Sequence, residues 1–202
     1  MMKEITIVCV SYKRYELAPV LIHCFLAQTL QNFKLLMMHD GPDEKMEEIF
    51  SEFKAKHPDR FDYYFSAERY NDYGHSLRDI GIKMADTEYI LITNDDNYYC
   101  PDFLEIMFNA LHQTNASIVM CDMVHGHNNP GGRPQLRHTY FETFPQINSV
   151  DMGCFIVKTS FAKQVGFRDK GYAGDATYFQ DLLSVAGDGK FAKVHQILFY
   201  HN

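Results

Sequence analysis

Two adjacent carboxylates, Asp95 and Asp96, follow an apolar run in the stretch LITNDDNYYCPD, residues 91–102. Like charges side by side repel, and a carboxylate at the edge of a core loses hydration, so a partner must compensate for both. Mg²⁺ and Mn²⁺ prefer oxygen ligands and keep coordination positions for phosphate oxygens. The pair therefore indicates a cation and a polyanion at this point, whereas a solvated surface turn is the alternative.

Three further polar residues follow apolar runs in the same way. Ser11 and Tyr12 come after the first run, and Asp40 comes after the second. In an open parallel α/β sheet, ligands bind outside the carboxyl ends of the strands. Polar residues at the ends of several strands predict one shared cleft, because separate surface turns would not require polar residues at all of these ends. Asp40 alone also fits a simple turn, since Gly41 and Pro42 follow it.

Strand-like and helix-like segments alternate along the first half of the chain. β-branched and aromatic runs predict strands, and apolar residues at helical spacing predict helices. The expected strands are 4–10, 33–39, 61–65 and 88–93, and the expected helices are 16–27, 44–56, 76–85 and 101–111. This alternation predicts right-handed βαβ crossovers, and hence an α/β fold with a mostly parallel central sheet and helices on both faces.

The pattern changes after residue 111. Strands are expected at 117–124, 154–157 and 191–200, with a helix at 175–185. A polar stretch rich in Gly and Pro, 126–146, predicts a long loop, and loops of this length usually carry function. No linker-like composition interrupts the chain, so we expect a single domain, 1–202, composed of the halves 1–100 and 101–202.

The composition restricts the class of protein. A net charge of −7 argues against a nucleic-acid partner, because nucleic-acid-binding surfaces are normally basic. Five scattered cysteines without a C-x-x-C pair are typical of free thiols in a reducing compartment. The N-terminal apolar run is too short for a signal peptide, and no window approaches the roughly 18 apolar residues of a membrane span. We expect a cytoplasmic protein with no transmembrane segment, whose association with a membrane would be peripheral.

Five motifs in order resemble those of GT-A-fold family 2 glycosyltransferases, closest in pattern to the spore-coat-polysaccharide type. They are ITIVCVSYKR (5–14), LLMMHDGPDE (35–44), YGHSLRDIGIKMADTEYILITNDDNYYCPDFL (73–104), DMGCFIVKTSFAKQVGF (151–167) and YAGDATYFQDL (172–182). The resemblance implies a GT-A fold whose half 1–100 binds a nucleotide and whose half 101–202 binds an acceptor. It also implies an inverting transfer, assisted by Mn²⁺ or Mg²⁺, from a nucleotide-sugar donor, which we expect to be UDP-linked. The acceptor would be a glycan or lipid-linked glycan in polysaccharide biosynthesis.

The resemblance further implies roles for residues of the donor site. Tyr12 would stack on the base, Asp40 would accept a hydrogen bond from its imide N–H, and Asp95 would hold the ribose or the sugar. Asp96 would coordinate the metal, with His201 near it. Ser11, Arg14 and Arg78 would complete the donor site. Arg78 also fits a solvated or salt-bridged helix residue.

On the acceptor side, the resemblance implies Asp175 as the general base that takes the proton of the acceptor hydroxyl. Asp151 is a second base candidate, for which we favour acceptor binding. Asp175 also fits a helix N-cap, a position that Asp favours whatever the function. Basic residues of the long loop, Arg133, Arg137 and His138, fit either an anionic acceptor or a solvated surface.

Two other functions compete with sugar transfer. A sugar nucleotidyltransferase also uses a metal and a parallel α/β sheet, but its Gly-rich loop is absent after the first strand, where SYKRYELAP stands at 11–19. A catalytically degenerate nucleotide-sugar binding module would keep the donor residues and lack turnover.

Overall fold

The computed structural model describes residues 4–126, 138–146, 149–187 and 190–202. The first half forms four parallel strands in the order β3-β2-β1-β4. The strands are β1 (Ile5–Ser11), β2 (Phe33–His39), β3 (Phe61–Phe65) and β4 (Tyr89–Asn94), and the helices between them are α1 (Leu17–Leu26), α2 (Glu44–Lys56) and α3 (His75–Met84). The predicted elements between residues 4 and 94 are confirmed, each with ends that agree to within one residue, whereas the helix predicted at 101–111 begins at Phe103 and ends at Thr114.

Local sequence explains these elements. Every residue of β1 is buried, as expected for an apolar strand covered on both faces of a parallel sheet. Helix α2 begins after Asp43, whose carboxylate accepts a hydrogen bond from the Met46 N–H at 2.9 Å. Gly81 lets α3 approach β1, because a Cβ at this position would lie only 2.4 Å from a Val8 methyl carbon. Helix α3 thereby carries Arg78 to the edge of the sheet.

The second half continues the sheet in the order β4-β8-β6-β9-β5, with β7 paired to β6. Its strands are β5 (Tyr98–Tyr99), β6 (Ile118–His125), β7 (Thr139–Phe141), β8 (Phe155–Lys158) and β9 (Phe191–His201). Its helices are α4 (Phe103–Thr114), the 3₁₀ helix η1 (Met152–Cys154), α5 (Thr159–Val165) and α6 (Gly174–Ala186). Strands β6 and β9 are parallel, whereas β8, β7 and β5 add antiparallel pairs. The α/β fold class is confirmed.

Four elements of the described residues were not expected from the sequence: β5, β7, η1 and α5. Strand β7 lies inside the predicted loop 126–146, of which 127–137 lie outside the described residues. The Asp122 carboxylate accepts hydrogen bonds from the Tyr140 hydroxyl in β7 and from the Thr143 N–H that follows it. Strand β5 has two residues and α5 has seven, so neither is long enough to show a clear period.

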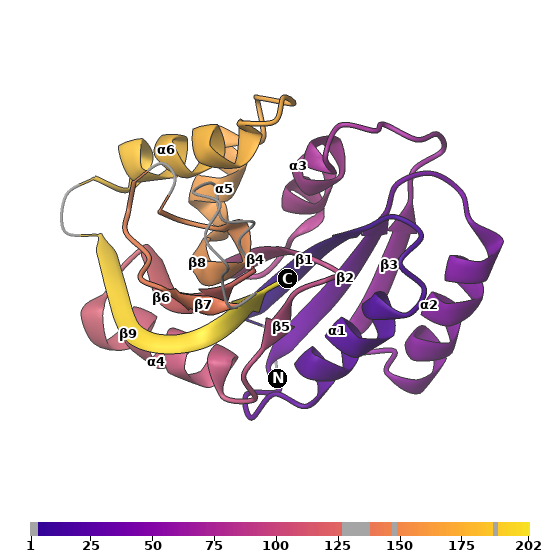
Figure 1. The fold of residues 1–202 in the computed structure, drawn as a ribbon, viewed down its shortest axis with the longest axis horizontal. Helices are drawn as coiled ribbons and strands as arrows, with labels where there is room; N and C mark the ends of the chain where they lie inside the picture. The colour runs from indigo at the N-terminus through magenta and orange to yellow at the C-terminus, as the bar shows by residue number, and fades with distance from the viewer. Residues whose placement is uncertain (1–3, 127–137, 147–148, 188–189) are drawn as a thin grey trace.

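The helices cover both faces of the curled sheet (Figure 1). Helices α1, α2 and α4 lie on one face, and α3, α5 and α6 lie on the other (Figure 1). Within the described residues, no helix is both long and apolar enough to cross a membrane. All five cysteines are free thiols, and Cys9, Cys121 and Cys154 are buried.

Candidate functional site

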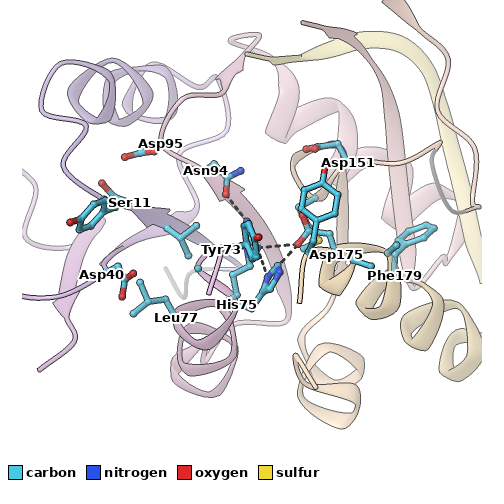
Figure 2. Close-up of a pocket in the computed structure, with 18 of the residues that line it drawn as sticks. Ser11, Asp40, Tyr73, His75, Leu77, Asn94, Asp95, Asp151, Asp175 and Phe179 are labelled. Atoms are coloured by element: carbon cyan, nitrogen blue, oxygen red, sulfur yellow. Dashed lines mark hydrogen bonds and ion pairs between the residues drawn. The ribbon is translucent and has the colours of Figure 1, made fainter. Parts of the chain in front are cut away.

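A pocket of about 950 Å³ lies at the carboxyl ends of β1, β2 and β4, facing η1 and α6. This volume is at the upper end of the range for small-molecule sites. Eight predicted site residues line it: Ser11, Tyr12, Arg14, Asp40, Arg78, Asp95, Asp151 and Asp175. The other two, Asp96 and His201, contact lining residues. Figure 2 shows Ser11, Asp40 and Asp95 on one side, Asp151 and Phe179 on the other, and Tyr73 and His75 between them.

Asp40 organises the loop that follows β3. It is 7% exposed, and its carboxylate accepts hydrogen bonds from the backbone N–H groups of Tyr70, at 2.8 Å, and Asn71, at 3.1 Å. Asp40 is therefore more than a turn former before Gly41. A carboxylate has about four acceptor positions, so it retains capacity for a ligand N–H.

The ring of Tyr12 is already covered in part. The Arg69 guanidinium carbon lies 3.8 Å from the centre of the Tyr12 ring, and its Nε lies 3.8 Å from Asp40 Oδ2. His39 stacks at a ring distance of 5.9 Å from Tyr12. Arg69 is about half exposed, so it has room to turn away. A base that stacks on Tyr12 would have to displace it.

Asp95 is a buried carboxylate with an oxygen that lacks a partner. Its exposed fraction is 3%, and Oδ2 has no hydrogen-bond partner among the described residues. Burial raises the pKa of Asp95 to about 6, against the opposing effects of Ser11 and Arg14. Arg14 Nη1 lies 3.6 Å from Asp95 and forms an ion pair with Asp96. An unsatisfied buried carboxylate oxygen in a pocket indicates a ligand group that completes it.

These two carboxylates bear on the metal that the fold family implies. Among the described residues, no group of three His, Cys, Asp or Glu side chains could hold a metal ion. A divalent cation bound by one or two carboxylates and by substrate phosphates does not need such a group. The unsatisfied oxygen of Asp95, beside Asp96, fits a site of that kind.

Arg78 connects three polar groups of the pocket. Only 2% of it is exposed, so Arg78 is not solvated, whereas the alternative of a salt-bridged helix residue is confirmed by its ion pair with Asp175. Its Nη1 donates to Asp175 Oδ1 at 3.0 Å and to His75 Nδ1 at 2.7 Å, and its Nη2 donates to Asn94 Oδ1 at 2.7 Å. The Gly171 carbonyl, 3.0 Å from His75 Nε2, can only accept, so the imidazole proton is on Nε2 and Nδ1 accepts from Arg78.

His75 is therefore neutral in this network. Burial lowers the pKa of His75, and the adjacent Arg78 charge lowers it further, despite the opposing effect of Asp175. The imidazole holds the guanidinium, and the guanidinium in turn holds the Asp175 carboxylate.

Asp175 lies in the first turn of α6, whose N-cap residue is Ala173. The expectation of an N-capping role is thus wrong, because the Asp175 carboxylate contacts Arg78 instead of the helix N–H groups. Its side chain is 45% exposed and lines the pocket. Among the described residues, Arg78 and His75 both contact Oδ1 of Asp175, so Oδ2 remains accessible to a hydroxyl group.

Asp151 and His201 form a second pair on the far side of the pocket. Asp151 Oδ1 accepts the Gly153 N–H at 2.9 Å, and Oδ2 lies 3.3 Å from His201 Nε2. Burial raises the pKa of Asp151, against the opposing effect of His201. The His201 ring stacks on His125 with centres 4.1 Å apart. His201 therefore lies beside the acceptor candidate, and its role at a metal remains a prediction.

Several residues of the pocket were missed by sequence reasoning. They are Arg69, Tyr73, His75, Asn94 and Tyr172. The spacing of three residues from His75 to Arg78 would have placed both on one helix face, and Asn94 directly precedes the predicted carboxylates. The other three lie in loops, whose paths no periodic pattern defines. Among the predicted basic loop residues, the His138 ring lies 4.8 Å from that of Tyr200, whereas Arg133 and Arg137 lie outside the described residues.

Comparison with solved structures shows the same fold. S. aureus TarS 1-349 in complex with UDP has a TM-score of 0.78 and 15% identity, over 98% of this chain and 60% of that chain. The mannosyltransferase PcManGT from Pyrobaculum calidifontis, in complex with GDP-Man and Mn²⁺, has a TM-score of 0.75 and 12% identity, over 100% of this chain and 57% of that chain. The structural likeness establishes the GT-A fold.

Sequence comparison identifies the family. An "Uncharacterized glycosyltransferase" of Rickettsia felis is 28% identical over 112 residues, which are 55% of this chain and 18% of the relative. The chain thus corresponds to about a fifth of the length of that relative. The model of the family described as glycosyl transferase family 2 matches residues 6–172, most of the chain. The chain belongs to glycosyl transferase family 2.

Proposed function

We propose that this chain transfers a sugar from a nucleoside diphosphate donor, UDP-linked, to a hydroxyl acceptor with inversion at the anomeric carbon. The observation that carries the proposal is the arrangement of one pocket. It combines Tyr12 and Asp40 at one end with Asp175 at the other, and Asp95 lies on the donor side. In this proposal, residues 1–100 bind the nucleotide and residues 101–202 bind the acceptor.

The donor end suits a uracil base and its ribose. Tyr12 offers a ring face once Arg69 turns away, and Asp40 can accept from the imide N–H of the base. The unsatisfied Oδ2 of Asp95 can accept from a ribose hydroxyl or bind a cation. Solved structures of TarS 1-349 with UDP and with UDP-GlcNAc share the fold and thereby support a uridine donor.

The far end suits proton removal. Asp175 takes the proton of the acceptor hydroxyl while the acceptor oxygen forms a bond to the anomeric carbon. The bond from that carbon to the donor phosphate oxygen breaks, and its electron pair leaves with the nucleoside diphosphate. Arg78 and Asn94 orient the Asp175 carboxylate, because the Arg78 guanidinium donates hydrogen bonds to both Asp175 and Asn94.

We propose that Mn²⁺ or Mg²⁺ binds with the donor, held by Asp95 and Asp96. Such an ion would neutralise charge on the departing diphosphate. The structure of the mannosyltransferase PcManGT in complex with GDP-Man and Mn²⁺, which has the same fold, supports this choice. Arg14 would then exchange its ion pair with Asp96 for the diphosphate.

The acceptor and the cellular location are also proposals. We propose a glycan or lipid-linked glycan acceptor in polysaccharide biosynthesis. A cytoplasmic location with peripheral access to membranes is supported by the five free cysteines. The pocket has no Gly-rich loop of a nucleotidyltransferase after β1, where Ser11 and Tyr12 stand instead.

The experiment compares Asp175→Asn with Asp181→Asn, a matched control on the same helix that pairs with Arg168 outside the pocket. UDP binding is measured by titration calorimetry with Mn²⁺, and transfer by UDP release from a panel of UDP-, GDP- and dTDP-sugars. We expect Asp175→Asn to bind UDP as the unmodified chain does and to lose UDP release, whereas Asp181→Asn retains both. Lack of nucleotide binding by the unmodified chain would refute the donor site. Full activity of Asp175→Asn would refute the role of Asp175 as the general base. UDP binding by the unmodified chain without release of UDP from any sugar donor would favour a degenerate binding module.

A further inference from the structure

Two tyrosine rings stand exposed at the mouth of the pocket. Tyr73 is 64% exposed and Tyr172 is 87% exposed, and both line the pocket beside the buried polar groups. Their rings meet edge to face with centres 5.8 Å apart. Exposed aromatic surface that gathers beside a pocket indicates a contact surface for a ligand.

A hydrogen-bond network holds the loops that carry these rings. Tyr73 precedes α3 and Tyr172 precedes α6, and His75 joins the two loops through the Gly171 carbonyl at 3.0 Å. The Lys170 ammonium donates to the His75 carbonyl at 3.1 Å. The turn of Tyr172 is braced further by the Asp169 carboxylate, which accepts from the Gly171 N–H at 2.9 Å. Hydrogen bonds therefore hold the loops that carry both tyrosines, and His75, which joins these loops, also binds Arg78.

The backbone at Tyr73 is strained. Its φ is +61°, in the left-handed region that side chains other than glycine rarely adopt, and Asn71 has a φ of +53°. The Asn71 N–H is held by Asp40, and Asp72 accepts from the Ser76 N–H at the start of α3. Strain that neighbouring contacts maintain is typical of ligand sites. Here it aims an exposed ring at the mouth of the pocket.

The position of the rings selects the acceptor side. Tyr172 lies three residues before Asp175 in the turn that leads into α6. In the view of Figure 2, Tyr73 lies between the donor residues and Asp151, and Tyr73 and Asp175 line the same pocket. Because both tyrosines and Asp175 line one pocket, a sugar that stacked on Tyr172 and contacted Tyr73 would have its hydroxyls on the side of the Asp175 carboxylate.

The charges of this rim select an uncharged ligand. Asp169 and Asp175 both lie within three residues of Tyr172, and both carry carboxylates. The neighbouring cations among the described residues are already engaged: Lys170 donates to the His75 carbonyl, Arg168 pairs with Asp181, and Arg78 pairs with Asp175. Carboxylates repel an anionic acceptor but accept hydrogen bonds from sugar hydroxyls.

We propose that Tyr73 and Tyr172 form a platform for a pyranose ring of an uncharged glycan acceptor, with the sugar stacked on the face of Tyr172 and in contact with Tyr73. The inference rests on the proposed function, because it places the acceptor beside Asp175. A pyranose ring presents an apolar face of C–H groups and a rim of hydroxyls. The face covers the exposed aromatic surface, and the hydroxyls reach the carboxylates around it.

The experiment uses the absence of Trp from the sequence. Tyr172→Trp introduces a single fluorophore at the platform, and Met84→Trp introduces one at another exposed apolar position, which does not line the pocket. Both variants are titrated with cellotetraose, chitotetraose and mannotetraose, and with the acyclic polyol sorbitol, with and without UDP. We expect at least one oligosaccharide to shift the emission at position 172 in a saturable way, and sorbitol to have no effect.

Titration calorimetry of the responding oligosaccharide checks the affinity. We expect Tyr172→Ala to weaken binding about tenfold, the equivalent of one stacking contact. Met84→Ala should bind as the unmodified chain does. No response to any of the three oligosaccharides, an equal response at position 84, or unchanged affinity in Tyr172→Ala would overturn the proposal.

UDP binding is measured on every variant, and it separates this inference from the proposed function. A chain that binds UDP but no oligosaccharide would keep the donor site and overturn the platform. A chain that binds an oligosaccharide through Tyr172 but no nucleotide would keep the platform and refute sugar transfer. UDP binding by Tyr172→Ala also shows that this variant is folded.

Discussion

Replacing Asp95 by Asn should stabilise the ligand-free protein at neutral pH. Burial raises the pKa of this carboxyl from 3.8 to about 6, so the folded state binds its proton more tightly than the unfolded state does. Between these two pKa values the unfolded chain is ionised and the folded chain is not. The free energy of unfolding therefore falls as the pH rises through this window, and the loss is complete above about pH 6.

The magnitude follows from the same pKa values. At about 1.4 kcal/mol for each pKa unit, ionised Asp95 lowers the free energy of unfolding by about 3 kcal/mol at pH 8. About half of this loss develops between pH 5 and pH 8. Asn is nearly isosteric and does not ionise, so the stability of Asp95→Asn relative to the unmodified chain should increase by roughly 1.5 kcal/mol over that interval.

The assay is urea unfolding followed by circular dichroism at pH 5, 6.5 and 8, without nucleotide and with a chelator. Asp122→Asn is a control, because it should lower the free energy of unfolding, whereas Asp95→Asn should raise it. Burial tends to raise the pKa of Asp122, but hydrogen bonds from Lys193 and the Thr143 N–H outweigh it and lower the pKa. Ionised Asp122 thus stabilises the folded state above its unfolded pKa, and this stability is lost as the pH falls through the folded pKa. A stability difference for Asp95→Asn that stays constant from pH 5 to pH 8 would refute the reasoning.

Three further predictions follow from the contacts. His75→Ala should leave Arg78 Nη1 with one partner fewer, costing about 1–3 kcal/mol in urea unfolding, and should lower the turnover of a UDP-sugar while UDP affinity in calorimetry is retained. Asp40→Ala should weaken UDP binding in calorimetry at least about tenfold, because it removes the acceptor for the base and frees the loop after β3; unchanged affinity would exclude Asp40 from the donor site. Gly81→Ala should cost about 1–3 kcal/mol by crowding Val8, and a melting temperature equal to that of the unmodified chain would contradict the close packing of α3 on β1.

The first half of the fold was predictable because β1, β2 and β4 are largely buried on both faces. Such strands have mostly apolar sequences: every residue of β1 is buried, and in β2 every residue except Lys34 is buried. The polar residues that follow them then lie at one edge by topology alone. That is why Tyr12, Asp40 and Asp95 could be assigned to one pocket from the sequence.

The connections of the site could not be predicted in this way. Helical spacing places His75 near Arg78, but only the tertiary packing brings Gly171 to the other side of the imidazole. The ion pair of Arg14 with Asp96 joins the turn after β1 to the turn after β4. Contacts of this kind join loops that are far apart in the sequence, and no periodicity encodes them.

The pocket keeps features that reduce the stability of the ligand-free protein. Asp95 has an unsatisfied buried oxygen, and Tyr73 has a left-handed backbone. Each is costly without a ligand and becomes useful with one, since a bound cation or ribose hydroxyl would satisfy Asp95 and a stacked sugar would cover Tyr73. Ligands at these two positions touch different loops, so the donor and the acceptor should stabilise the protein separately. The loop that carries Tyr73 is held by Asp40 at the donor end, through the Asn71 N–H, and is joined through His75 to the loop of Tyr172. A ligand at Asp40 therefore has a physical route by which it can order the acceptor side.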